Sequence, residues 1–114
     1  MSDLDELRRR LREFAAERDW GQFHTPKNLA MALVAEGGEL LEHFQWLTAD
    51  ESAALPPARR EAVAAELADM LLYLIMLADR LDIDLVESAR NKIEANERRY
   101  PADRVRGSAE KAGR

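Results

Sequence analysis

The chain has 114 residues, enough for one small domain, and its 46% of hydrophobic residues can form a modest core. Its net charge of −5 argues against a nucleic-acid duplex or an anionic membrane as the main partner, and no apolar run approaches the roughly 18 residues that cross a bilayer. Cysteine is absent, so any metal ion must be bound by oxygen or imidazole. We expect one cytoplasmic domain over residues 1–114, with a polar and flexible tail from about residue 102.

Apolar residues recur every three or four positions, and no segment alternates as a β-strand does, so the pattern predicts an all-α fold. The first helix is expected from Asp3 to Glu17. One face of this helix is an apolar stripe formed by Leu4, Leu7, Leu11 and Phe14. The opposite face is expected to be solvated and carries Arg8, Arg9, Arg12 and Arg18.

Two longer helices are expected in the middle of the chain. Thr25 is a suitable N-cap and proline suits the first helical position, which predicts a helix from Pro26 to about Phe44. A capping-box segment, Thr48–Glu51, precedes a third helix from about Pro57 to Leu81. This helix is apolar nearly all the way round from Leu67 onward. Because so small a domain cannot cover it from every side, we expect the protein to be an oligomer.

Asp84 and Glu87 form an N-cap signal for a last helix, which should end at about Arg99, before Pro101. Lys92, Asn96 and Arg99 share one face of this helix, where they could bind phosphate groups. Basic residues near a helix C-terminus also commonly complement the helix dipole and face solvent. The pattern alone leaves both interpretations open.

Two acid pairs lie within the most apolar helical sequence: Glu36 with Glu39, and Glu66 with Asp69. Residues three apart share a helix face, and the segments 35–41 and 65–71 repeat one pattern, Ala-Glu-x-x-acid-x-Leu. Two such helices packed together would place four carboxylates around one space. Burying carboxylates requires a compensating cation, and four oxygen ligands suit Mg²⁺, which often completes its coordination with substrate phosphates.

Spacing alone does not single out these pairs, because acidic residues three positions apart occur seven times in the chain. Most of the others open or end helices or lie among charged neighbours. Gly37 and Gly38 add weight, since each glycine inside a helix costs about 1 kcal/mol relative to alanine. Either the close approach of another backbone or ligand, or a helix kink, would explain them.

Aromatic residues flank the second helix, namely Trp20, Phe23, His24 and Trp46. Aromatic residues at helix ends more often fill a core than bind a ligand. Tyr73, however, continues the face of Glu66 and Asp69 one turn further on and should face the same space. A nucleobase could stack among such rings.

In the combination and order of these motifs, the chain resembles the all-α nucleoside triphosphate pyrophosphohydrolases of the MazG-like superfamily, whose signature E-x-x-E…E-x-x-D is matched by the two acid pairs. It is most similar to the dCTP pyrophosphatase branch, over roughly residues 11–111. The segments that carry this likeness are 17–24 (Glu-Arg-Asp-Trp-Gly-Gln-Phe-His), 44–46 (Phe-Gln-Trp), 99–101 (Arg-Tyr-Pro) and 106–108 (Arg-Gly-Ser).

The resemblance implies a four-helix-bundle-type fold in a homotetramer of paired dimers, which hydrolyses a deoxynucleoside triphosphate to the monophosphate and pyrophosphate with Mg²⁺. The implied metal ligands and catalytic residues are Glu36, Glu39, Glu66 and Asp69. The implied base and sugar pocket contains Trp20, Phe23, His24, Trp46 and Tyr73. The residues implied to lie near the phosphates are Lys92, Asn96, Arg99 and Tyr100.

The substrate is expected to be dCTP or a modified dCTP. A broader dNTP or dUTP pyrophosphohydrolase, and a helical module that binds metal or nucleotide without catalysis, remain alternatives. The resemblance does not assign the carboxylate that orients the attacking water.

Overall fold

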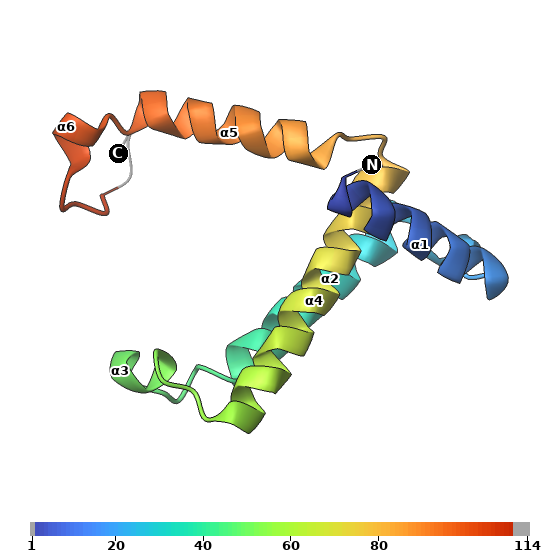
Figure 1. Ribbon diagram of the computed structural model, residues 1–114, viewed down its shortest axis with the longest axis horizontal. Helices are drawn as coiled ribbons and strands as arrows, with labels where there is room; N and C mark the ends of the chain where they lie inside the picture. The colour runs from blue at the N-terminus through green and yellow to red at the C-terminus, as the bar shows by residue number, and fades with distance from the viewer. Residues whose placement is uncertain (1, 111–114) are drawn as a thin grey trace. The chain divides into compact units, whose positions relative to one another are not determined.

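A computed structural model describes residues 2–110, and among these it contains helices and no strand, which confirms the all-α prediction (Figure 1). The elements are α1 (Asp3–Glu17), the 3₁₀ turn η1 (Gly21–Phe23), α2 (Pro26–Glu42), α3 (Ala49–Ser52), α4 (Pro57–Arg80), α5 (Leu85–Arg99) and α6 (Ala102–Val105). The chain divides into two compact units, residues 1–82 and 83–114. None of the described helices is long and apolar enough to cross a membrane.

The helices begin where the sequence supplies side-chain oxygens for their first free N–H groups. Ser2 Oγ accepts a hydrogen bond from Asp5 N at 3.2 Å, and Asp5 bonds back to complete a capping box. Thr25 caps α2 through Asn28 N at 3.2 Å, and Pro26 follows in the first turn. Because these caps satisfy otherwise unpaired backbone donors, local sequence sets the start of α1 and α2.

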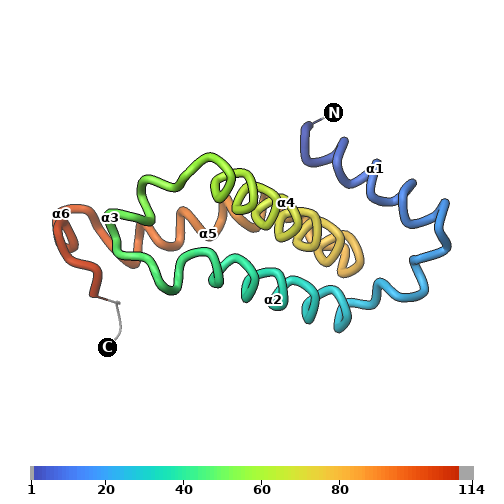
Figure 2. Tube along the Cα trace, turned by 90° about the horizontal axis from the view of Figure 1, so that it is seen from below, coloured from blue at the N-terminus to red at the C-terminus, as the bar shows by residue number. Residues whose placement is uncertain are grey.

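Helices α2 and α4 pack side by side and run in opposite directions (Figure 2). Among residues 2–110 the buried apolar side chains are few: Leu29, Val63, Ile75 and Ala78. Helix α4 was predicted to be buried on more than one side, yet within this one chain much of its apolar surface stays exposed, as Leu67 shows with 52% exposure. A single chain therefore leaves apolar helix surface uncovered.

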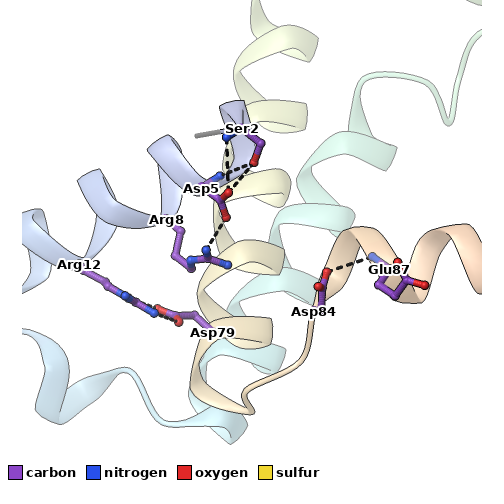
Figure 3. A network of polar contacts seen from close by, with 7 residues as sticks. All are labelled: Ser2, Asp5, Arg8, Arg12, Asp79, Asp84 and Glu87. Atoms are coloured by element: carbon purple, nitrogen blue, oxygen red, sulfur yellow. Dashed lines mark hydrogen bonds and ion pairs between the residues drawn. The ribbon is translucent and has the colours of Figure 1, made fainter.

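Helix α1 is held on α4 by an ion pair between Arg12 and Asp79 (Figure 3). Arg12 Nε and Nη2 donate to the two carboxylate oxygens of Asp79 at 2.8 and 2.5 Å, so the contact is bidentate. Asp79 is only 22% exposed at its side chain. Arg12 is largely exposed, as predicted, but it is not merely solvated, because it binds a residue 67 positions away.

Replacing Asp79 by asparagine is expected to lower the melting temperature by a few degrees at pH 7. Hydrogen bonding from Arg12 lowers the pKa of Asp79, against the opposing effect of burial. A lowered pKa stabilises the fold above the unfolded value of about 3.9, and this contribution is lost as the pH falls through the folded pKa. The deficit of the variant should therefore shrink on acidification, measured by thermal unfolding at several pH values. Glu61→Gln, an exposed change on the same helix, should show no such trend; an equal deficit at every pH would contradict the assignment.

Candidate metal and nucleotide site

Three of the four predicted carboxylates gather between α2 and α4. One oxygen each from Glu36, Glu39 and Glu66 lies within 4.8 Å of the others. Among residues 2–110 no other group of three potential ligands lies so close. The short distances between these carboxylate oxygens thus distinguish the cluster from the other acidic pairs, which sequence spacing alone could not do.

The carboxyl groups of the cluster repel one another and have buried oxygens without partners. One carboxylate oxygen of Glu36 and one of Glu66 are buried without a hydrogen-bond partner among the described residues. The facing carboxyl of Glu66 is the main cause of a raised pKa for Glu36, with burial next and the charge of Asp69 also contributing. Unpartnered buried oxygens and mutual repulsion are the conditions that a bound cation would relieve, so this donor set fits a hard divalent metal ion.

Asp69 is not part of this three-carboxylate group, although its charge contributes to the raised pKa of Glu36, and it lines a cavity of about 390 Å³ in the first unit. The cavity has two helical walls with the same spacing. From α1 it is lined by Leu7, Arg10, Leu11 and Phe14, and from α4 by Asp69, Leu72, Tyr73 and Met76. Each set follows the i, i+3, i+4, i+7 pattern of one helix face, so two neighbouring helices enclose the space.

A tight turn after α1 brings Trp20 into the same cavity. Asp19 adopts a left-handed conformation (φ 52°), with Asp19 N bonded to Ala16 O at 3.2 Å and Trp20 N to Ala15 O at 2.9 Å. These bonds form a Schellman motif, in which the residue after the left-handed position typically contacts the helix it has just left. The Trp20 ring accordingly packs edge-on against Phe14, with the ring centroids 5.6 Å apart.

Two more of the predicted pocket residues, His24 and Tyr73, line the cavity with Trp20. Phe23 and Trp46 do not line it and are 60% and 86% exposed, so a role for these two stays a prediction. Their apolar rings are available to a neighbouring molecule rather than to this cavity.

The predicted phosphate-binding residues belong to the second unit. Lys92 and Asn96 are exposed on α5, and the Arg99 guanidinium lies 5.7 Å from the ring centroid of Tyr100. Their predicted role stays a prediction.

Sequence reasoning missed part of the cavity wall. The sequence predicts Leu7 and Phe14 only as part of an apolar stripe, and Leu72 and Met76 only as part of an apolar helix. On α4, Leu72 and Met76 stand at helical spacing from Asp69 and Tyr73, and this spacing is the signal that could have shown that they line the cavity. Arg10 was missed altogether, although it stands three residues after Leu7 on the stripe itself.

Within the described part of the chain, no residue crowds either glycine of α2. A Cβ at Gly37 would meet the Met70 methyl at 3.8 Å, an ordinary contact, and one at Gly38 would meet no described atom within 4 Å. The packing of α2 on α4 therefore does not require either glycine.

The fold and the acid cluster define the class of protein: the chain belongs to the MazG-like family, whose model matches residues 32–114. Mouse dCTP pyrophosphatase 1 is 50% identical over 108 residues, which cover 93% of this chain and 64% of the mouse protein. The human dCTP pyrophosphatase 1 is 49% identical over 110 residues, covering 95% of this chain and 65% of that protein. The chain thus spans a little under two thirds of the length of these curated relatives.

The fold also matches a solved structure. The crystal structure of a pyrophosphatase from Archaeoglobus fulgidus superimposes with a TM-score of 0.83 at 43% sequence identity, covering 89% of this chain and 94% of that one. The helical arrangement described above is therefore shared with an experimentally determined member of the same structural class.

Proposed function

We propose that this protein hydrolyses a deoxynucleoside triphosphate, preferably dCTP or a modified dCTP, to the monophosphate and pyrophosphate, with Mg²⁺ as cofactor. The observation that carries the proposal is the carboxylate cluster of α2 and α4, which shares helix α4 with an aromatic cavity that Asp69 lines. The naming of close relatives as dCTP pyrophosphatases supports it. Its role would be to remove unwanted nucleotides from the cytoplasmic pool.

The residues present fit a divalent ion. Glu36, Glu39 and Glu66 supply oxygen donors that converge, and we propose Asp69 as a further ligand or as the group that orients water. When bound, Mg²⁺ neutralises phosphate charge and polarises the phosphorus–oxygen bonds. A water oxygen attacks the α-phosphorus, the bond from that phosphorus to the α,β-bridging oxygen breaks, and pyrophosphate leaves with that oxygen. The water's proton passes to one of the cluster carboxylates or to solvent.

The cavity suits a nucleoside in size and chemistry. Ligand pockets usually span about 300–1,000 Å³, and this one encloses about 390 Å³. Trp20, Phe14 and Tyr73 offer ring surfaces for stacking on a base, while His24 and the Tyr73 hydroxyl can form hydrogen bonds with its polar edge. The cavity and the acid cluster together can hold the two ends of a nucleotide.

The proposal is tested by a pyrophosphate-release screen over the four common dNTPs, dUTP and modified dCTPs, with and without Mg²⁺. We expect release that requires the metal and is fastest with dCTP or a modified dCTP. Fastest turnover of dUTP, or equal turnover of all substrates, would replace the dCTP assignment by the broader one. Tight nucleotide binding with no release from any of them would overturn the enzymatic proposal in favour of a binding module.

We also propose that a second copy of this chain covers the exposed apolar stripes of α2 and α4, within a tetramer of paired dimers. On α2 the stripe comprises Met31, Val34 and Leu41, with Gly38 between the last two, and on α4 it comprises Leu67, Leu71 and Leu74. Because few of the described side chains are buried, the protein gains a larger core if such surfaces meet. Gly38, which no residue between 2 and 110 approaches closely, would allow a partner helix to pack against it.

A further inference from the structure

Arg10 stands apart from the arginines around it. Arg9 forms an ion pair with Glu13 at 3.0 Å, Arg8 pairs with Asp5, and Arg12 with Asp79. Arg10 forms no hydrogen bond or ion pair with any residue between 2 and 110. Arg8, Arg9 and Arg12 each pair with a carboxylate of the chain, whereas the guanidinium of Arg10 is available to bind a ligand.

The position of Arg10 on its helix points the same way. It lies three residues after Leu7 and four before Phe14, on the face of α1 that lines the cavity, where every other lining residue of that helix is apolar. Arg10 is exposed, so its methylene stem can pack along this apolar face while its guanidinium stays accessible to a ligand. Its position therefore suits contact with a ligand bound in the cavity.

The polar groups of the cavity determine what Arg10 can bind. Asp69 lines the opposite helical wall, but the two side chains are not paired, so a cation and a carboxylate face one space from different helices. A guanidinium binds planar or tetrahedral oxyanions through paired N–H donors, and phosphate is the usual one. A phosphate chain lying between Arg10 and a divalent ion held by the carboxylates would be neutralised from both sides.

We propose that Arg10 binds the phosphate chain of the substrate from the α1 wall of the cavity and thereby sets affinity for triphosphates over the products and nucleosides. This inference rests on the proposed function and deepens it, since it adds a phosphate ligand on a helix other than those that carry the carboxylates. Arg10 acts by contact with the bound nucleotide and takes no part in transferring protons.

Binding measurements separate this role from a merely structural one. The probes are the α,β-methylene analogue of dCTP, which cannot be cleaved at the reacting bond, then dCMP and deoxycytidine, each titrated calorimetrically with Mg²⁺ present. Arg10→Gln should weaken binding of the analogue by about tenfold to a hundredfold, as expected for a lost hydrogen-bonded charge, with little change for deoxycytidine. Arg10→Lys should recover part of the lost affinity, because lysine restores the positive charge but not the paired N–H donors of the guanidinium.

Arg9→Gln is the matched control, since it removes the neighbouring charge from a side chain paired with Glu13. It should bind the analogue as the parent protein does, and neither variant should change the melting temperature much. Equal losses for the analogue and deoxycytidine would assign Arg10 to the base instead, and unchanged binding of the analogue in Arg10→Gln would overturn the proposal. If the parent protein binds the analogue but releases no pyrophosphate from dNTPs, the proposed function fails while the role of Arg10 in binding is still decided by these titrations.

Discussion

Replacing Glu39 by glutamine is expected to reduce pyrophosphate release by at least about a hundredfold while leaving the helical circular dichroism spectrum unchanged. The amide keeps the shape of the side chain but removes one of the three charges that converge in the cluster. Because Glu39 is exposed, the fold does not depend on it. The measurement is turnover of dCTP at saturating Mg²⁺, together with calorimetric titration of the metal.

Glu42→Gln provides the control for this experiment. Glu42 lies three residues further along α2, is also exposed, and stands outside the carboxylate cluster. It should retain the turnover and metal affinity of the parent protein. Full activity in Glu39→Gln, or an equal loss of activity in both variants, would show that the carboxylate cluster has no specific part in the reaction.

Placing a charge on the exposed stripe of α2 is expected to break the oligomer. Val34 is 74% exposed in the single chain, and a partner covering it would have to bury any charge placed there. Val34→Glu should weaken self-association by several kcal/mol, the effective penalty for burying an unpaired carboxylate. Light scattering coupled to gel filtration should show a multiple of 13.0 kDa for the parent protein and a smaller species for the variant.

Ala53→Glu introduces the same charge at an exposed position beyond α3 and should leave the assembly intact. A parent protein that is monomeric at all concentrations would contradict the proposed pairing. An unchanged oligomer in Val34→Glu would move the interface to other surfaces of the chain.

The helices could be predicted because the signals that set them are local. Ser2, Thr25 and Thr48 cap the N–H groups three residues ahead, and the bounds Asp3–Glu17 of α1 follow from such contacts and the apolar stripe. The gathering of three carboxylates could also be predicted, since residues three apart on two similar apolar helices converge when the helices pack.

Other features depend on contacts that no local pattern encodes. The pairing of Arg12 with Asp79 joins residues 67 apart, and either could equally have remained solvated. The left-handed conformation of Asp19 occurs without the glycine that usually marks it, so the turn that places Trp20 was not visible in the sequence. The predicted roles of Phe23 and Trp46 came from likeness to a family, and the geometry of one chain does not place them at the cavity.

The Schellman turn at Asp19 ties Trp20 to the end of α1, so one helix and its final turn carry the leucines, Arg10 and both rings of one cavity wall. The carboxylate cluster is carried by α2 and α4 instead. In the proposed function, the groups of α1 that would contact the nucleotide and the carboxylates that would bind the metal ion are therefore encoded in largely separate stretches of the chain. We expect mutations in residues 7–20 to alter nucleotide binding without altering the proposed metal ligands, which makes this segment a target for redirecting the protein to other nucleotides.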